Sequence, residues 1–192
     1  MNSSLSASSG YLEIIVGPMF SGKTSRLIEL HKQFTFCNIP VLTINHTFDT
    51  RYHESMLSNH NQDMIECSRL NALSELWDEE KGTKEYLSAQ VILINECQFF
   101  PDLYCGVVEM LKDNKRIYIA GLDGDFKRQQ FGQVLNLIPL CDTVTKLSAL
   151  CNICKNGTIG IFSKRITQEI EQTVVGSDNY IPVCRKCYEK NE

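Results

Sequence analysis

The stretch YLEIIVGPMFSGKT, residues Tyr11–Thr24, decides how the rest of this chain is interpreted. Its first six residues are mostly apolar and partly β-branched, which predicts a buried strand. The next eight, GPMFSGKT, fit the pattern G-x-x-x-x-G-K-[ST] of a phosphate-binding loop, whose backbone N–H groups surround phosphates while the lysine reaches the outer ones. A helix-like segment, Ser25–Phe36, follows and completes the strand–loop–helix context that the motif requires. This context disfavours the alternative, a glycine-rich turn with a chance lysine.

The composition is that of an ordinary globular protein with an acidic balance. The chain has 192 residues, of which 43% are hydrophobic and 22% are charged, and its net charge is −4. This length fits one domain with a small appendage, and the apolar content is enough for a buried core. The acidic balance argues against a nucleic-acid-binding protein, although a nucleotide site needs only a few placed residues and a helix N-terminus.

The start of the chain carries no sign of a targeting segment. Residues 1–10, MNSSLSASSG, are serine-rich and lack the basic start and apolar core of a signal peptide, so we expect a disordered tail. No apolar run reaches the roughly 18 residues that a membrane-spanning helix needs. We therefore expect a soluble intracellular protein that uses neither a membrane nor nucleic acid as a partner.

Apolar strands alternate with helices along the first three-quarters of the chain. After the loop we predict strands at residues 41–45, 64–67, 91–95 and 116–120, and helices at residues 69–77 and 103–112. Continuous apolar strands of this kind indicate an α/β fold with a parallel sheet flanked by helices. Ligands of such sheets bind at the carboxyl ends of the strands. We therefore expect one edge of the sheet to gather the polar residues that follow Val16, Asn45, Asn95 and Ala120.

The character of the sequence changes near Leu150, where paired cysteines and short β-like runs begin. We expect an α/β domain at residues 11–148, a small second domain at 149–188 and a tail at 189–192. Within the second domain, Cys151 and Cys154 form one Cys-x-x-Cys pair, and Cys184 and Cys187 form another. Four thiolates suit a tetrahedral, closed and therefore structural Zn²⁺ site. Buried small side chains and a redox dithiol are the alternatives.

A carboxylate, Glu96, follows the most apolar predicted strand, VILIN at residues 91–95. At the end of a strand, such a group can accept a proton from a substrate hydroxyl. It can equally be a solvated loop residue or a helix-capping partner. The residues alone leave these readings open.

The order of motifs adds a family resemblance. GPMFSGKT is followed by DTRY at residues 49–52, ECQFFPD at 96–102, GLDGDF at 121–126 with Phe131-Gly132 after it, and then the two cysteine pairs. Over about residues 10–188 this order resembles the cytosolic, type II thymidine kinases of cells and large DNA viruses. The resemblance implies a RecA-like phosphate-loop sheet and a zinc-binding domain whose long "lasso" loop closes over a nucleoside. It also implies a cytoplasmic location, in the host cytoplasm if the chain is viral.

The implied reaction moves the γ-phosphate of ATP to the 5′-hydroxyl of thymidine, giving dTMP and ADP for DNA synthesis. Glu96 matches the catalytic base, and Thr24 matches the hydroxyl that faces Mg²⁺. The ATP and phosphate side would use Gly17, Pro18, Met19, Phe20, Ser21, Gly22, Lys23, Thr24, Asp49, Thr50, Arg51, Asn95 and Gln98. The nucleoside side would use Met19, Leu122, Phe126, Phe131, Ser163, Glu171, Gln172, Thr173, Val174, Val175 and Tyr180. Family members are commonly homotetramers that dTTP inhibits.

Two residues depart from the family pattern. Asn95 stands where the family usually has an aspartate that helps to hold Mg²⁺, and an amide keeps an acceptor oxygen but loses the charge. We therefore expect Mg²⁺ to be held mainly by phosphates, Thr24 and water. Ser163 replaces a usual threonine, and either hydroxyl could serve.

Two other kinds of protein fit parts of this sequence. One is a phosphate-loop motor or recombinase-like ATPase with a zinc knuckle for nucleic acid, since similar sheets host both functions. The acidic charge and the short chain disfavour it. The other is a non-catalytic zinc-binding interaction protein, which the presence of Lys23, Thr24 and Glu96 disfavours.

Overall fold

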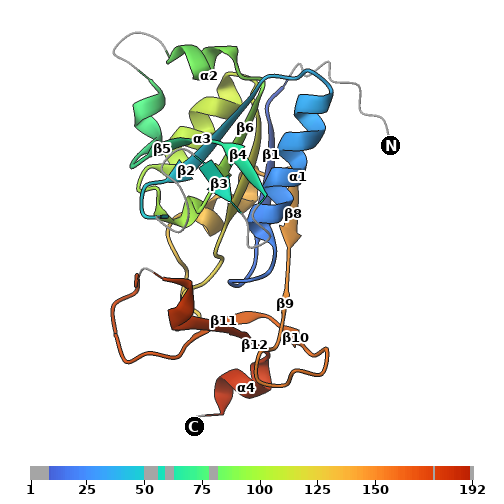
Figure 1. The fold of residues 1–192 in the computed structure, drawn as a ribbon. Helices are drawn as coiled ribbons and strands as arrows, with labels where there is room; N and C mark the ends of the chain where they lie inside the picture. The colour runs from blue at the N-terminus through green and yellow to red at the C-terminus, as the bar shows by residue number, and fades with distance from the viewer. Residues whose placement is uncertain (1–8, 50–55, 59–62, 78–81, 175, 191–192) are drawn as a thin grey trace.

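A computed structural model describes residues 9–49, 56–58, 63–77, 82–174 and 176–190 (Figure 1). Its strands are β1 (Tyr11–Val16), β2 (Val41–His46), β3 (Met56–Ser58), β4 (Met64–Glu66), β5 (Ser68–Leu70), β6 (Val91–Asn95), β7 (Arg116–Gly121), β8 (Thr143–Lys146), β9 (Ala149–Leu150), β10 (Ile159–Gly160), β11 (Phe162–Arg165) and β12 (Tyr180–Val183). Its α-helices are α1 (Lys23–Phe36), α2 (Lys84–Ser88), α3 (Leu103–Lys112) and α4 (Arg185–Glu189). Short 3₁₀-helices are η1 (Leu73–Leu76), η2 (Cys97–Phe99), η3 (Val134–Leu140) and η4 (Ser177–Asn179).

Six strands form a central sheet in the order β5-β2-β6-β7-β1-β8, and every neighbouring pair is parallel. The predicted α/β fold with a parallel sheet flanked by helices is therefore confirmed. The predicted strands at 11–16, 41–45, 91–95 and 116–120 all lie in this sheet. Because the strands are parallel, their carboxyl ends meet at one edge.

Two apolar layers cover the two faces of the sheet. On one face, Leu27 and Leu30 of α1 pack against Ile15, Leu93 and Ala120. On the other face, the apolar residues of α3, η1 and η3 form the larger cluster with the alternate residues of the same strands. The strands are thus buried on both sides, which explains why they read as continuous apolar runs.

The predicted helix at residues 69–77 is wrong. The chain there forms β5, which pairs with β2, and then η1. Leu73 and Leu76 are buried three residues apart, a spacing that a 3₁₀-helix also satisfies. The carboxylate of Asp102 accepts hydrogen bonds from the backbone N–H groups of Leu73 and Ser74 at 2.9 and 2.7 Å. These tertiary contacts hold the start of the short helix.

The edge strand β8, next to β1, was not predicted. Its sequence TVTK is mostly polar, and its side chains are largely exposed. It is a strand because it pairs with β1, from Glu13–Thr143 to Val16–Lys146. Pairing with a distant segment leaves little local signal in the sequence.

The C-terminal segment, residues 149–190, lies at one end of the molecule, beyond the lower edge of the sheet in Figure 1. It contains two small antiparallel sheets, β9–β10 and β11–β12, and the short helix α4. Within the described residues, none of the helices is both long and apolar enough to cross a membrane.

Candidate active site

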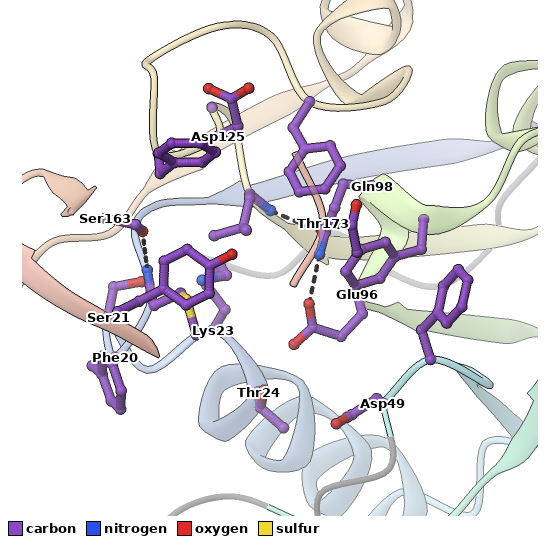
Figure 2. Close-up of a pocket in the computed structure, with 18 of the residues that line it drawn as sticks. Phe20, Ser21, Lys23, Thr24, Asp49, Glu96, Gln98, Asp125, Ser163 and Thr173 are labelled. Atoms are coloured by element: carbon purple, nitrogen blue, oxygen red, sulfur yellow. Dashed lines mark hydrogen bonds between the residues drawn. The ribbon is translucent and has the colours of Figure 1, made fainter. Parts of the chain in front are cut away.

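One cavity opens at the carboxyl ends of the central strands, where the sequence placed the ligand edge (Figure 2). The loop after β1, the start of α1 and the segments after β2, β6 and β7 all contribute to it, and the C-terminal segment closes one side. Its lining comprises Met19, Phe20, Ser21, Gly22, Lys23, Thr24, Ser25, Phe48, Asp49, Ser58, Glu96, Gln98, Phe99, Leu122, Gly124, Asp125, Phe126, Phe131, Ser163, Gln172, Thr173, Val174, Gly176 and Tyr180.

The loop between β1 and α1 has the geometry of a phosphate cradle. Gly17 has φ 151°, and a Cβ there would lie 2.4 Å from the carbonyl oxygen of Leu147, so only glycine fits. Lys23 Nζ donates to the carbonyl oxygen of Pro18 at 2.8 Å and lines the cavity. The buried hydroxyl of Ser21 has no hydrogen-bond partner among the described residues. An unpaired buried hydroxyl beside a lysine and a helix N-terminus fits an anionic ligand such as phosphate.

Glu96 sits in a sparsely populated backbone conformation directly after β6. Its φ of 50° and ψ of 40° lie in the left-handed region, which is unusual for a residue other than glycine. Gln98 Nε2 donates to Glu96 Oε2 at 2.6 Å, and Gln98 Oε1 accepts from the backbone N–H of Leu122 at 3.0 Å (Figure 2). The buried amide of Gln98 therefore ties the carboxylate to the end of β7. Strained residues of this kind concentrate at functional sites.

Aromatic side chains form one wall of the cavity. Phe99 meets Phe131 edge to face, with ring centroids 5.5 Å apart, and Phe48 meets Phe99 at 5.7 Å. Behind them, His46 Nδ1 accepts from the backbone N–H of Phe48, and Nε2 is 3.2 Å from the carbonyl oxygen of Asn71. This arrangement requires the neutral ring with its proton on Nε2. Burial lowers the pKa of His46 below its usual value, which favours the same form.

Strand β11 brings the C-terminal segment onto the phosphate loop. The buried hydroxyl of Ser163 accepts a hydrogen bond from the backbone N–H of Met19 at 2.9 Å (Figure 2). Further along, Gln172 Nε2 donates to Asp125 Oδ2 at 2.8 Å. The other oxygen of Asp125 accepts from the backbone N–H groups of Lys127 and Gln129. The segment is thus fastened at two points of the cavity rim.

Arg165, at the end of β11, holds the following loop by its carbonyl oxygens. Its Nη1 donates to the carbonyls of Glu169 and Glu171 at 2.8 and 2.5 Å, and its Nη2 donates to that of Gln172 at 3.2 Å. Nη2 also donates to the hydroxyl of Tyr180. The guanidinium lies 3.7 Å from the ring centroid of Phe126, a cation–π contact. One buried cation therefore fixes the loop and an aromatic lining residue together.

The four paired cysteines converge in the C-terminal segment. Their sulfur atoms all lie within 4.8 Å of one another, with Cys154 Sγ 3.4 Å from Cys187 Sγ and 3.9 Å from Cys184 Sγ. Four thiolates at about 2.3 Å from a Zn²⁺ ion would be about 3.8 Å apart, so the cluster fits structural zinc. The neighbouring residue, Tyr188, donates its hydroxyl to the carbonyl oxygen of Phe126 at 2.6 Å. The cysteine cluster is therefore coupled to the cavity wall.

The structure brings most of the predicted site residues to the cavity. Gly17, Pro18, Asn95 and Glu171 do not line it, although they adjoin residues that do. The predicted roles of Thr50, Arg51 and Val175 fall outside the described residues. Sequence reasoning missed several described residues that bear on the cavity: Phe48, Phe99 and Asp125 in its lining, and Asn45 and Arg165 behind it. Phe99 and Asp125 stand inside the quoted motifs ECQFFPD and GLDGDF, so position in a motif could have found them.

Comparisons with known proteins agree with this geometry. A model of the family described as thymidine kinase matches residues 10–188. The chain is 40% identical over 187 residues to a thymidine kinase of Yaba monkey tumor virus, which covers 97% of this chain and 98% of the viral protein. It is 37% identical over 180 residues to a cytosolic thymidine kinase of Gallus gallus, covering 93% of this chain and 77% of that protein. It is also 39% identical over 188 residues to a thymidine kinase of Fowlpox virus, covering 96% and 100%.

Proposed function

The chain belongs to the thymidine kinase family, and from this premise we propose that it transfers the γ-phosphate of ATP to the 5′-hydroxyl of thymidine. The products are dTMP and ADP. One observation carries the proposal: a single cavity holds a phosphate cradle, a strained carboxylate and an aromatic wall. These three parts match a phosphate donor, a proton acceptor and a planar base. They suit phosphoryl transfer, which depends on positioning and charge neutralisation more than on covalent chemistry.

The residues at the phosphate end suit Mg²⁺. Thr24 offers a hydroxyl and Asp49 a carboxylate at the same end of the cavity, and both are hard oxygen ligands (Figure 2). Bound with ATP, Mg²⁺ would neutralise charge that develops on the phosphates. Thr24 would contact the ion, Asp49 would hold its water ligands, and Lys23 would contact the outer phosphates. Buried Asn95 lies behind Thr24 instead of lining the cavity, which fits an indirect role for its amide.

Glu96 would accept the proton of the 5′-hydroxyl as the oxygen attacks the γ-phosphate. The hydrogen bond from Gln98 to Glu96 Oε2 orients the carboxylate. A base must lie within hydrogen-bonding reach of the proton that it removes, so this orientation is part of the chemistry. Gln98 acts here as a positioning residue.

The nucleoside side would bind thymine between aromatic faces and the loop held by Arg165. Phe126 lines the cavity and is held by the guanidinium of Arg165, so the base would stack on the part of the ring that faces the cavity. Met19, Leu122, Phe131 and Tyr180 add apolar contacts, and the backbone of residues 172–174 would read the base edge. A polar edge left unpaired by the wrong base is costly, which provides specificity.

Regulation and assembly follow the family expectation. Donor phosphates and acceptor base share one cavity, so dTTP could place its triphosphate in the phosphate cradle and its base in the nucleoside pocket. This supports feedback inhibition by dTTP. We also propose a homotetramer, a cytoplasmic location, a division into domains at residues 11–148 and 149–188, and structural zinc at the four cysteines.

The function is tested by incubating the protein with ATP, Mg²⁺ and a panel of nucleosides and identifying the phosphorylated product. We expect dTMP and ADP in equal amounts, with thymidine as the best acceptor. DNA-stimulated ATP hydrolysis without nucleoside phosphorylation would favour a motor instead. Nucleotide binding without either activity would favour a non-catalytic zinc-binding protein.

Substituting Gly121 tests the positioning of Glu96. In Gly121→Ala, the new Cβ would lie 2.5 Å from Gln98 Oε1 and from Cys97 Sγ, so Gln98 must move and take Glu96 with it. We expect kcat to fall by up to about 100-fold, the cost of a misplacement near 1 Å. The measurement is steady-state dTMP formation alongside the melting temperature.

A matched control separates positioning from general destabilisation. A Cβ at Gly106, in α3, would lie 2.8 Å from Leu73 Cδ1, a similarly tight contact between residues that do not line the cavity. Gly106→Ala should lower the melting temperature and leave kcat near the wild-type value. Equal loss of kcat in both variants would show that Gly121 acts through stability alone.

A further inference from the structure

Four side chains at the phosphate end form a continuous chain of hydrogen bonds. Asn45 Nδ2 donates to Asp49 Oδ2 at 3.1 Å, and Asn95 Nδ2 donates to Asn45 Oδ1 at 3.1 Å. Thr24 Oγ1 lies 3.3 Å from Asn95 Oδ1 and completes the chain. Asn45 and Asn95 face each other in the register of β2 and β6 and are only 3% and 2% exposed. We call this chain the amide relay (Asp49, Asn45, Asn95 and Thr24).

The direction of the amide relay is fixed from one end. An ionised carboxylate only accepts, so Asn45 must present its NH₂ group to Asp49 and its oxygen to Asn95. Asn95 must then present its NH₂ group to Asn45 and its oxygen to Thr24. Within the relay, the Thr24 hydroxyl can therefore only donate its hydrogen bond to the Asn95 oxygen. Its proton points at Asn95, and its lone pairs are available to the cavity that Thr24 lines.

Resting on the proposed function, we propose that Asn45 is a positioning residue that orients the Thr24 hydroxyl toward a nucleotide-bound divalent cation. A cation binds to an oxygen lone pair, and a hydroxyl whose proton points into the cavity would repel it. Without an acceptor at Asn95, a helical threonine is free to turn toward the carbonyl one turn back. The neutral amide of Asn95 thus helps cation binding by orienting the Thr24 hydroxyl. A charged side chain at this position would instead help by attracting the cation.

The test measures cation binding directly, with no phosphate transfer. Mn²⁺ serves as the probe, and its binding to the enzyme–ADP complex is followed by the electron paramagnetic resonance signal of free Mn²⁺. Asn45→Leu keeps the size of the side chain and removes both hydrogen bonds. We expect the dissociation constant for Mn²⁺ to rise about tenfold, a usual effect of losing a residue that orients a metal ligand. Binding of ADP in the presence of EDTA should stay at the wild-type value.

Thr43→Val provides the matched control on the same face of β2. Thr43 is 4% exposed, and its hydroxyl has no hydrogen-bond partner in the described part of the chain. The control should leave Mn²⁺ affinity unchanged. Asn45→Ala, which leaves room for water, replaces Asn45→Leu if the latter does not fold, with the same expected tenfold loss.

Three results would overturn the proposal. The first is wild-type Mn²⁺ affinity in a folded Asn45 variant, and the second is an equal loss of Mn²⁺ affinity in Thr43→Val. The third is a parallel loss of metal-free ADP binding, which would reassign Asn45 to the general shape of the phosphate cradle. Failure of the proposed function is separable, because a wild-type protein that binds Mn²⁺ with ADP but phosphorylates no nucleoside would remove that function and leave the relay intact.

Discussion

Glu96→Gln should lower kcat for thymidine phosphorylation by about 10²- to 10⁴-fold, the usual contribution of a general base. The amide keeps the size of the side chain and can still present an oxygen to Gln98 Nε2, which lies 2.6 Å from Glu96 Oε2. It has no charge with which to take up the proton of the attacking hydroxyl. Because the fold and the phosphate cradle are unchanged, ADP should bind as tightly as to the wild type.

The measurement combines single-turnover dTMP formation with calorimetric ADP and thymidine binding. Glu109→Gln is the control, since Glu109 lies exposed on α3 and forms an ion pair with Lys112 at 2.7 Å. It should retain wild-type kcat. If Glu96→Gln loses ADP binding and turnover to the same degree, Glu96 is a structural residue and the proposed base must be sought elsewhere.

Cys151→Ser should remove the metal and damage the nucleoside side of the cavity before the ATP side. Structural zinc in small metal-bound folds contributes about 10–16 kcal/mol, so losing one of four ligands unfolds the local structure. Cys187 is followed by Tyr188, whose hydroxyl supports the carbonyl of Phe126, and the guanidinium of Arg128 lies 4.3 Å from the Tyr188 ring centroid. Losing these contacts frees Phe126, while Lys23 and the start of α1 stay held by the packing of α1 against the central sheet.

We expect kcat/KM for thymidine to fall about 100-fold, as for a misplaced binding group, with a much smaller change in the KM for ATP. The zinc content, measured by mass spectrometry, should fall below the one ion per chain that we expect for the wild type. Cys105→Ser is the control, because Cys105 is exposed on α3 and outside the cysteine cluster. A variant in which only the KM for ATP changes would contradict the placement of the nucleoside, and full activity without zinc would contradict the structural role of the metal.

The parts of the fold that were predictable carry their signal locally. The strand at Tyr11–Val16, the glycine pattern of the loop and the helix after it need only their own residues to be interpreted. The clustering of the four cysteines was equally predictable, because the spacing of metal ligands can be recognised from the sequence alone. The cavity followed from one rule, that parallel strands end at the same edge.

The parts that were missed depend on partners distant in the chain. The helix expected at residues 69–77 gave way to β5 and η1 because β2 and Asp102 were available to bind that segment. Asn45 gained a role only through its register with Asn95, fifty residues away. Arg165 binds carbonyl oxygens, which every residue type supplies, so no pattern of side chains could have pointed to it.

That last contact also bears on how this protein can evolve. The loop after β11 is held through main-chain oxygens of Glu169, Glu171 and Gln172, while the side chains of residues 166–171, which precede the cavity-lining Gln172, are exposed. Many replacements of these side chains leave the anchoring oxygens in place, so the loop can accumulate substitutions at little cost. An insertion or deletion between Arg165 and Gln172 would shift the oxygens away from the guanidinium. Natural variants should therefore differ in the amino acids of this loop and preserve its length.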